Sequence, residues 1–292
     1  MANQLFGGIE GGGTKFVCAV GDEDGKILAE TRFPTATPGE TISSAISFFK
    51  QQAQELGPIS ALGFACFGPL DPNPNSKTYG QILPTPKLGW TGADVVSPLK
   101  EALEVPIKFD TDVNGAALGE WRWGAAQGLD TFVYYTIGTG IGGGALVNGQ
   151  LLHGYAHPEM GHIYLPRHES DLDFPGVCPF HGACMEGLAS GPAIEARWQQ
   201  KAAALPPDHP AWSLEAHYLA QGLMNICLTL APQRIILGGG VMNQGFLFPM
   251  IRSVLTRLLS GYVRLPEIED MDRYVLPSSL AGIDGLYGGL AL

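Results

Sequence analysis

One order of short apolar segments and turns occurs twice in this chain of 292 residues, and it restricts the folds that the chain can adopt. Residues 5–33 read as strand, glycine turn, strand, Asp24-Gly25 turn and strand. Residues 131–153 repeat this order, with Asn148-Gly149 as the second turn. Asp-Gly and Asn-Gly between apolar segments are typical of antiparallel hairpins. The sequence therefore predicts two copies of a three-stranded antiparallel meander.

Helical and extended segments alternate around these meanders, which predicts an α/β chain. Thr37-Pro38-Gly39-Glu40 has the form of a capping box with Pro at the first helical position. The remaining prediction places strands at 59–66, 106–110 and 234–237, helices at 94–103, 114–124, 186–204, 211–230 and 243–260, and a small-residue helix or turn at 280–292. The segment 71–92 is rich in Pro, Asn, Gly and Thr and is expected to be a long loop.

The composition excludes several classes of partner. The chain is 45% hydrophobic and 15% charged, and its formal net charge is −11. This charge argues against nucleic acid or an anionic membrane as the main partner. The sequence contains no run of 18 apolar residues and no signal-peptide pattern at its start. We therefore expect a cytoplasmic protein without a membrane span.

A short cysteine and histidine cluster has the spacing of a metal site. Cys178, His181 and Cys184 form a Cys-x2-His-x2-Cys clip. Zinc favours four tetrahedral thiolate and imidazole ligands, so a fourth ligand is needed. His162 is preferred because Gly161 lets the backbone turn beside it, while His157, His168 and His153 remain alternatives. Four protein ligands would make the site structural.

Other interpretations of this cluster remain open. Cys178 and Cys184 could form a disulfide, although five cysteines without a signal peptide disfavour this. They could also be free cysteines near scattered surface histidines. Cys18, Cys66 and Cys227 lie among apolar residues and are expected to be small buried side chains.

The two glycine-rich turns are candidate phosphate sites. Residues 138–143 match G-x-G-x-x-G, but a dinucleotide-binding loop must open a helix, and here a strand follows. Residues 8–15 also differ from a P-loop, because Thr14-Lys15 is reversed and no helix follows. Successive backbone N–H groups in tight turns can still bind anions, and Thr14 and Thr139 would add hydroxyl groups. Ordinary β-turns remain the alternative.

Four segments together resemble the ROK sugar kinases, and most of all their bacterial fructokinase branch. They are residues 8–15, the 136–144 loop, His157-Pro-Glu-Met-Gly-His162 and the Cys-x2-His-x2-Cys clip. The resemblance covers essentially the whole chain. It implies a duplicated two-domain ATPase fold of the actin-like (ribonuclease H-like) class, with an interdomain cleft. We expect a smaller α/β domain of residues 1–112 plus 280–292, and a larger α/β domain of 113–279 that carries the zinc loop.

The resemblance also implies the reaction and the partners. It implies ATP, Mg²⁺ and one structural Zn²⁺, with transfer of the γ-phosphoryl group to a sugar hydroxyl. D-Fructose, converted to D-fructose 6-phosphate, is the first expectation for the substrate. Mannose, glucose or an amino sugar are the alternatives. A homodimer is expected from the resemblance alone.

Residue roles follow from the positions that match the family's motifs. Asp112 would be the general base. Asn114 would support either the sugar or the loop. The sugar would be bound by Glu159, His162, Glu186 and Lys87, with His162 also binding zinc beside Cys178, His181 and Cys184. The nucleotide and Mg²⁺ would be bound by Glu10, Gly11, Gly12, Gly13, Thr14, Lys15, Gly138, Thr139, Gly140, Gly142, Gly238, Gly239 and Gly240.

Three positions depart from the family's pattern. Glu10 stands where many relatives have Asp, and this longer acid could reach Mg²⁺ through water. Thr111 replaces an Asn before the base. Lys87 replaces an Asn that contacts sugar in glucokinase-like members, which weakens glucose as the substrate and favours fructose.

Each acid also has a simpler interpretation, and the whole chain has rival functions. Asp112 could be a helix N-cap, Glu10 an edge-strand acid, and Glu186 a helix-start acid favoured by the helix dipole. A transcriptional regulator of the same family would need a helix-turn-helix before the first hairpin, which begins by residue 8. A non-catalytic sugar-binding protein would not need Asp112 or the two phosphate turns. A zinc hydrolase would need an open metal position.

Overall fold

The chain forms two compact units. The computed structural model describes residues 4–264, 266–280 and 282–292. Unit 1 consists of Met1–Gln127, Leu151–Pro158 and Gly282–Leu292, and unit 2 consists of Gly128–Gln150 and Glu159–Ala281. The domain boundaries expected from the sequence stay a prediction.

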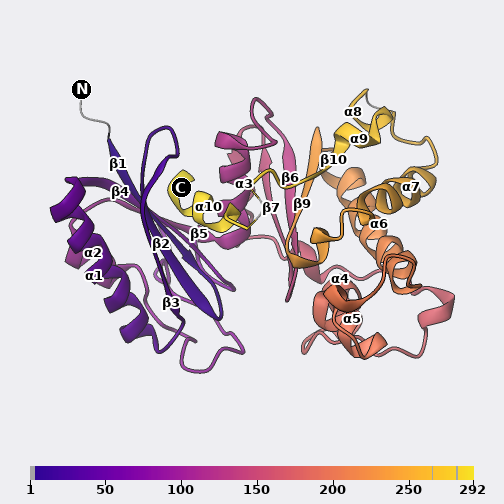
Figure 1. Ribbon diagram of the computed structural model, residues 1–292, viewed down its shortest axis with the longest axis horizontal. Coiled ribbons are helices and arrows are strands. Elements are labelled where there is room, and N and C mark those ends of the chain that lie inside the picture. The colour runs from indigo at the N-terminus through magenta and orange to yellow at the C-terminus, as the bar shows by residue number, and fades with distance from the viewer. Residues whose placement is uncertain (1–3, 265, 281) are drawn as a thin grey trace. The chain divides into compact units, whose positions relative to one another are not determined.

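Unit 1 is built on a five-stranded sheet with the order β3-β2-β1-β4-β5 (Figure 1). Its strands are β1 (Leu5–Gly11), β2 (Lys15–Asp22), β3 (Ile27–Pro34), β4 (Ile59–Cys66) and β5 (Ile107–Thr111). β1 pairs antiparallel with β2 and parallel with β4, which in turn pairs parallel with β5. Gly11 is in register with Cys66, and Cys66 with Thr111. The residues that follow these three strands therefore lie at one edge of the sheet.

Helices cover both faces of this sheet. They are α1 (Pro38–Leu56), α2 (Ser97–Leu103), α3 (Asp112–Trp123) and α10 (Asp284–Ala291). α1 begins with the predicted capping box, in which Thr37 and Glu40 exchange hydrogen bonds. The predicted helix at 94–103 begins only at Ser97, with Pro98 in its first turn. Phe49 of α1 and Leu99 of α2 join the buried core of the sheet.

Helix α10 approaches the opposite face very closely and also packs on α3. A Cβ atom at Gly63 of β4 would lie 2.0 Å from the carbonyl oxygen of Gly289. A Cβ atom at Gly288 would lie 2.4 Å from the carbonyl carbon of Gly115. Only glycine allows these backbones to meet. These contacts place α3 in unit 1.

Unit 2 repeats the sheet of unit 1, with the order β10-β9-β6-β7-β8. Its strands are β6 (Phe132–Ile137), β7 (Ile141–Val147), β8 (Gln150–Leu151), β9 (Arg234–Gly238) and β10 (Val275–Pro277). β6 pairs antiparallel with β7 and parallel with β9, as β1 does with β2 and β4. The predicted duplicated α/β architecture is confirmed. β7 begins at Ile141, so the turn before it is shorter than the predicted 138–143.

One predicted helix of unit 2 is interrupted where the sequence supplies a new N-cap. The helices of unit 2 are α4 (Met185–Ala189), α5 (Gly191–Trp198), α6 (Ala211–Leu230), α7 (Leu247–Leu259), α8 (Pro266–Glu269) and α9 (Met271–Tyr274). The predicted helix at 186–204 divides at Ser190, whose side chain accepts the N–H of Ala193 and starts α5. Pro192 follows in the first turn of α5 and cannot continue α4.

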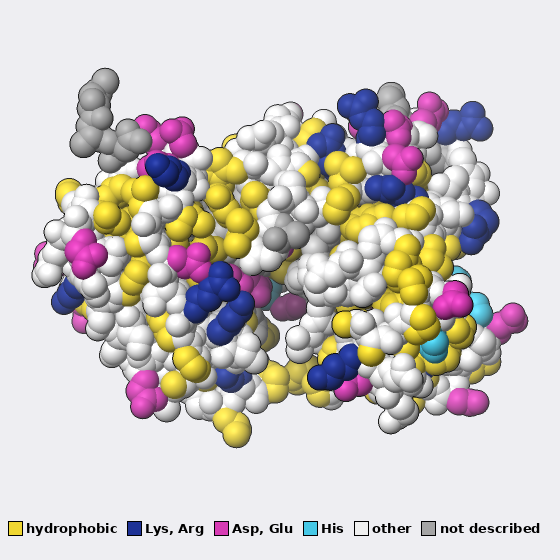
Figure 2. Space-filling view, in the orientation of Figure 1, with side chains coloured by type: hydrophobic (Ala, Val, Ile, Leu, Met, Phe, Trp, Pro, Cys, Tyr) yellow, Lys and Arg dark blue, Asp and Glu magenta, His cyan; other side chains and the backbone are white. Residues whose placement is uncertain are grey.

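The surface carries both signs of charge. Acidic, basic and hydrophobic side chains are interspersed over the face drawn in Figure 2. Within the residues that the structure describes, no helix combines the length and apolar character that crossing a membrane requires.

Candidate active site

Asp112 lies directly after β5, as the first residue of α3. The Thr111 side chain accepts the N–H of Asn114 at 3.2 Å and is therefore the N-cap of this helix. Oδ1 of Asp112 accepts the N–H of its neighbour Val113 at 2.9 Å. The N-cap role that was the alternative for Asp112 thus belongs to Thr111. The Asp112 carboxylate is half-buried at the sheet edge where β1 and β4 also end.

A buried polar cluster supports the start of α3. Asp110 is 4% exposed. Its Oδ1 accepts the N–H of Thr111 at 2.7 Å and the Nδ2–H of Asn114 at 2.8 Å. Its Oδ2 lies 2.8 Å from Nε2 of His153. This hydrogen bond raises the pKa of His153, against the opposing effect of burial. Asn114 therefore supports the loop, which was one of its two expected roles.

The first glycine turn, residues 12–14, directs its carbonyl groups into unit 1. Thr35 Oγ1 donates to the Gly12 carbonyl at 2.7 Å, and Thr35 N donates to the Thr14 carbonyl at 3.0 Å. The N–H of Gly12 donates to the Lys15 carbonyl at 2.9 Å. In the described part of the chain, the N–H groups of Gly13 and Thr14 meet no acceptor. A turn whose carbonyl oxygens already accept hydrogen bonds, and whose N–H groups meet no acceptor, can bind an anion.

Glu10 lies next to this turn on β1 and faces α10. A Cβ atom at Gly285 would lie 2.6 Å from its Oε1, so glycine makes room for the carboxylate there. Burial raises the pKa of Glu10, and the charge of Asp284 raises it further, while Lys15 and Arg32 lower it. Glu10 is therefore a partly buried acid with a second acid nearby, which is an arrangement that a cation would stabilise.

Lys87 reaches the same turn from the long loop. Its Nζ donates to the Gly13 carbonyl at 2.5 Å. Trp90 anchors the loop, since it is fully buried and its Nε1 donates to the Ala36 carbonyl at 3.1 Å. The N–H of Trp90 donates to the Lys87 carbonyl at 3.2 Å. The loop therefore places Lys87 at the candidate phosphate turn.

The second glycine turn lies between β6 and β7 in unit 2. Gly138 donates to the Gly140 carbonyl at 2.9 Å, which closes the turn around Thr139. Oε2 of Glu186 accepts the N–H of Ile141 at 3.0 Å. Gly142, predicted as a turn residue, lies in β7 opposite Thr136. Glu186 also lies in the first turn of α4, which is the position that its simpler interpretation predicts.

A third glycine turn lies beside the second. Gly238 ends β9 and is in register with Thr136 of β6, so both turns occupy one edge of the unit 2 sheet. Gly239 has a φ of 88°, and a Cβ atom there would lie 2.4 Å from the Ile137 carbonyl oxygen. Only glycine fits this position. Gly240 has open space around its Cα.

Four side chains converge at the candidate metal centre of unit 2. The ligand atoms of His162, Cys178, His181 and Cys184 all lie within 4.8 Å of one another. Nδ1 of His162 lies 3.3 Å from Nδ1 of His181 and 3.6 and 3.5 Å from the two sulfur atoms. Tetrahedral bonds to zinc would separate such ligand atoms by about 3.3–3.8 Å. The three distances from His162 therefore fit one tetrahedral ion.

The other histidines proposed as fourth ligands have different partners. His157 accepts the N–H of Leu70 at 3.2 Å, His153 pairs with Asp110, and His168 contacts Ser170. All five cysteines are free, so no disulfide links Cys178 and Cys184. Gly161 fits beside His162 for a reason the sequence did not reveal. A Cβ atom there would lie 1.7 Å from the Ile141 carbonyl oxygen.

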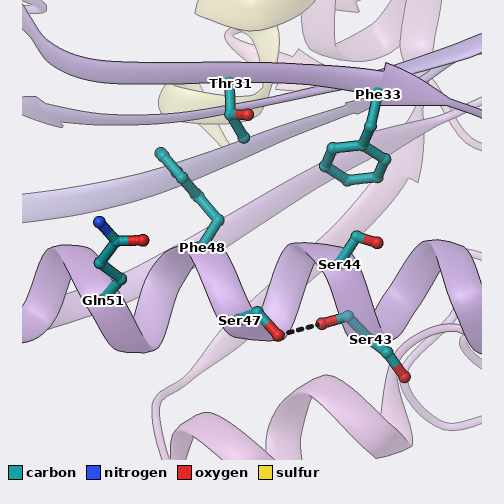
Figure 3. A pocket seen from close by; sticks show the side chains of 7 residues that line it. All are labelled: Thr31, Phe33, Ser43, Ser44, Ser47, Phe48 and Gln51. Atoms are coloured by element: carbon teal, nitrogen blue, oxygen red, sulfur yellow. Dashed lines mark hydrogen bonds between the residues drawn. The ribbon is translucent and has the colours of Figure 1, made fainter.

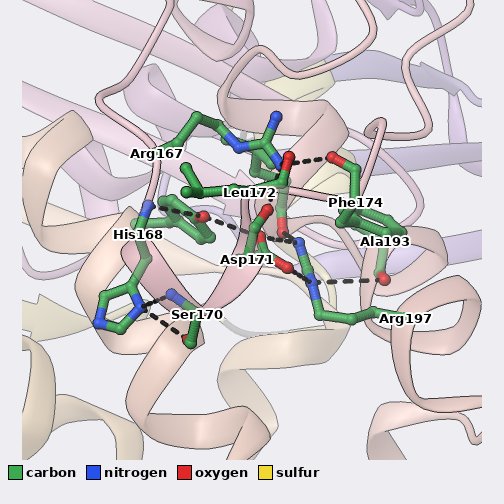
Figure 4. A network of polar contacts seen from close by, with 10 residues as sticks. Arg167, His168, Ser170, Asp171, Leu172, Phe174, Ala193 and Arg197 are labelled. Carbon is green, nitrogen blue, oxygen red and sulfur yellow. Dashed lines mark hydrogen bonds and ion pairs between the residues drawn. The ribbon is translucent and has the colours of Figure 1, made fainter.

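Residues 163–177 form an arm between the metal ligands His162 and Cys178, and a buried ion pair holds this arm in place (Figure 4). Arg197 of α5 donates to both carboxylate oxygens of Asp171, at 2.8 and 3.1 Å. Tyr218 donates to Asp171 Oδ2 at 2.7 Å. Arg167 donates to the carbonyl groups of Asp171 and Phe174. The arm is thus held at several points between His162 and Cys178.

Glu159 immediately precedes the short 3₁₀ turn Met160–His162. Its carbonyl accepts the N–H of His162 at 3.0 Å, and its side chain is exposed. The structure thus brings Glu159 next to the candidate metal centre.

One surface pocket lies away from all predicted site residues. It has a volume of about 430 Å³ and lies between β3 and α1, where Phe33, Phe48 and Gln51 line it with three serines and Thr31 (Figure 3). None of its lining residues is titratable. Its lining therefore contains no candidate general acid or base.

Two polar pairs of the structure were not predicted from the sequence, Asp110 with His153 and Asp171 with Arg197. The members of each pair are far apart in sequence, so no local motif indicates them. The position of Asp110 near the end of a strand was the one available signal, since polar groups at strand ends often act in a site.

Comparisons with known proteins agree on one family. A family model described as "ROK family" matches residues 6–292. A fructokinase of Lactococcus lactis is 48% identical over 261 residues, which cover 89% of this chain and 87% of the relative. A fructokinase of Zymomonas mobilis is 43% identical, with 99% of this chain and 96% of the relative covered. A ROK family glucokinase of Streptomyces griseus, solved with glucose and AMPPNP, has a TM-score of 0.76 at 26% identity, and the match covers 98% of each chain.

Proposed function

This chain belongs to the ROK family, and we propose that it is an ATP-dependent fructokinase that converts D-fructose to D-fructose 6-phosphate. One observation carries this assignment. The chain shares 43–48% of its residues with fructokinases along most of its length. Its actin-like α/β fold is that of the ROK glucokinase. Glucose, mannose or an amino sugar remain the competing substrates.

Asp112 is the proposed general base. Its carboxylate takes the proton of the 6-hydroxyl group while the hydroxyl oxygen forms a bond to the γ-phosphorus. The bond from the γ-phosphorus to the bridging oxygen breaks, and ADP leaves with that electron pair. Positioning and electrostatics dominate such transfers, because the transition state is loose. The support for this role is the fixed position of Asp112 at the carboxyl edge of the unit 1 sheet.

The glycine turns are the proposed phosphate and nucleotide sites. The amides of Gly13 and Thr14 in the first turn, and those of Thr139 and Gly140 in the second, would donate to phosphate oxygens. Thr14 and Thr139 would add hydroxyl groups, and Lys15 a charge. The Gly238–Gly240 turn would hold the adenosine, which its position beside the second turn supports. Mg²⁺, when bound, would neutralise charge on the phosphates. Glu10 is the proposed carboxylate for that ion, since Mg²⁺ prefers oxygen ligands.

The metal centre is proposed to hold one structural Zn²⁺. The ligand spacing supports this, and four protein ligands leave no open position for hydrolysis. Glu159, His162 and Glu186 are proposed to bind sugar hydroxyls. This role has support from the sequence positions of the two acids, because Glu159 lies close to the metal ligand His162 and Glu186 close to the metal ligand Cys184. Zinc would then hold the sugar-binding carboxylates in position.

A coupled ADP-release assay across a panel of hexoses tests the proposal. We expect the highest kcat/KM with D-fructose. Asp112→Asn should keep sugar and ATP binding but lower kcat by at least about a hundredfold, because it removes the base. Asp24→Asn, at an exposed turn of unit 1, is the matched control and should leave kcat unchanged.

Two outcomes would contradict this account. Near-wild-type turnover in Asp112→Asn would remove Asp112 from the mechanism. Absence of ADP release with every hexose would leave a non-catalytic sugar-binding protein as the better description.

We also infer a homodimer in a reducing compartment such as the cytoplasm. The family resemblance supports the dimer, and light scattering coupled to size-exclusion chromatography tests it. Five free cysteines support the reducing compartment, because disulfides form readily in oxidising ones.

A further inference from the structure

The first glycine turn could bind an anion through its two free amides and also through a charged group beside them. The three carbonyl groups of residues 12–14 are all bound, by Thr35 on either side and by Lys87 at Gly13. The amides of Gly13 and Thr14 meet no acceptor within the described residues. The space beside Gly13 is open, since a Cβ atom there would meet nothing within 4 Å. A charged group therefore adjoins an open pair of donors.

Lys87 supplies that charge. An ammonium group has three N–H donors, and the Gly13 carbonyl accepts one of them. Within the described ranges, the other two N–H groups meet no protein acceptor. The buried Trp90 fixes the loop only three residues further on, so the position of Lys87 does not depend on a substrate. A preformed ammonium beside free amides matches a phosphate better than a neutral hydroxyl.

We propose that Lys87 contacts the γ-phosphoryl group of ATP and not a hydroxyl of the sugar. This inference rests on the proposed kinase function and revises the sugar-binding role expected for Lys87. It makes Lys87 a catalytic residue, because its ammonium would face oxygens that gain charge during transfer.

The register of the unit 1 sheet indicates why Lys87 would contact the γ-phosphoryl group and not another phosphate of ATP. Gly11, Cys66 and Thr111 are in register, so the first turn and Asp112 lie at one edge of the unit 1 sheet. A phosphoryl group at this turn is thus the group next to the base. The second turn instead adjoins the Gly238–Gly240 turn of unit 2, which is the proposed place of adenosine.

Isothermal titration of the full chain with Mg²⁺ present tests this inference through binding alone. AMPPNP has a γ-phosphoryl group, whereas ADP lacks one. In Lys87→Gln we expect AMPPNP affinity to fall about 10- to 100-fold, the range for a hydrogen bond between charged groups. ADP affinity and D-fructose affinity should each stay within about twofold, because neither contact is lost. The kcat should fall as well.

Two further variants sharpen the test. Lys77→Gln removes the same charge from an exposed position of the same loop and should change none of these affinities. Lys87→Arg keeps the charge and should recover part of the AMPPNP affinity, with a geometric loss because the guanidinium is planar.

Three results would overturn the inference. A loss of fructose affinity with unchanged AMPPNP affinity would make Lys87 a sugar contact. An equal loss for ADP and AMPPNP would mean that Lys87 only holds the turn. Unchanged affinities for all three ligands would give Lys87 no role in binding. A wild-type protein that binds AMPPNP but does not phosphorylate fructose would refute the proposed function alone, since the comparison of AMPPNP with ADP still reports on Lys87.

Discussion

The side chain of His153, paired with Asp110, holds a segment of the chain that returns to unit 1. His153 belongs to residues 151–158, which rejoin unit 1 between two segments of unit 2. Its Nε2 lies 2.8 Å from the carboxylate of the buried Asp110, with side-chain exposures of 34% and 6%. Because Asp110 also bonds the backbone of Thr111 and the side chain of Asn114, the pair connects this return segment to the start of α3.

This pair should make stability depend on pH. The hydrogen bond to Asp110 raises the folded-state pKa of His153 above its ordinary value of 6.5, although burial and Lys108 oppose the shift. Its contribution is therefore complete below that ordinary value and is lost as pH rises through the folded pKa. His153→Gln should lower the free energy of unfolding by about 0.5–1 kcal/mol near pH 6 and by less near pH 9. Denaturant unfolding at both pH values measures this.

His209→Gln is a suitable control for that experiment. In the described part of the chain His209 has no carboxylate partner, and its Nδ1 accepts a backbone N–H. Its replacement removes an imidazole that has no carboxylate partner, so a loss of stability like that of His153→Gln near pH 6 should not appear. An equal loss at both pH values in His153→Gln would mean that the imidazole acts through packing alone.

At the scale of elements, the metal clip connects two turns of unit 2. His162 follows Gly161, which touches the Ile141 carbonyl, and Cys184 precedes Glu186, which binds the Ile141 amide. Residues close in sequence to two of the proposed zinc ligands therefore contact the amide and the carbonyl group of Ile141, the first residue of β7 after the second glycine turn.

Cys178→Ser should remove the metal and disturb both neighbouring functions. We expect elemental analysis to show no bound zinc and the KM for fructose to rise about tenfold or more, because Glu159 and Glu186 lose their anchor. Cys227→Ser is the control, since Cys227 contacts Tyr274 and is no candidate ligand. Unchanged kinetics in a metal-free Cys178→Ser would break the link between the ion and the sugar.

The metal clip could be predicted from the sequence, but the contacts that hold it in place could not. Cys178, His181 and Cys184 are close in sequence, so their spacing alone indicated a shared ion. The arm before them depends on Asp171 and Arg197, whose pairing is set by the packing of α5. The simple alternative for Asp112 failed for a local reason, because Thr111 caps α3 one residue earlier.

At the scale of the molecule, the duplicated meander was predictable because glycine turns and Asn-Gly or Asp-Gly pairs are local signals. The strand order was not, since the pairing of β1 with β4 and of β6 with β9 follows long connections. The assignment of α3 to unit 1 also depends on a distant element, α10.

Gly63→Ala should therefore destabilise one unit selectively. The new Cβ atom would lie 2.0 Å from the Gly289 carbonyl oxygen, so α10 must shift from β4. Overpacking of this kind costs about 1–3 kcal/mol. Hydrogen exchange should increase at amides of β1 and β4 but not of β6 and β9.

Gly39→Ala is the control for this substitution. Gly39 lies in the first turn of α1, and a Cβ atom there would meet nothing within 4 Å. It should leave exchange unchanged in both sheets. Faster exchange throughout both units in Gly63→Ala would mean that they unfold together.

The packing of α10 on β1 and β4 has a consequence for biosynthesis. Strands β1 and β4 leave the ribosome early, but the helix that covers one of their faces is translated more than two hundred residues later. Until then that face of the nascent sheet has no α10 to shield it from water. A chaperone that occupies the face during this interval would protect the unfinished protein from aggregation.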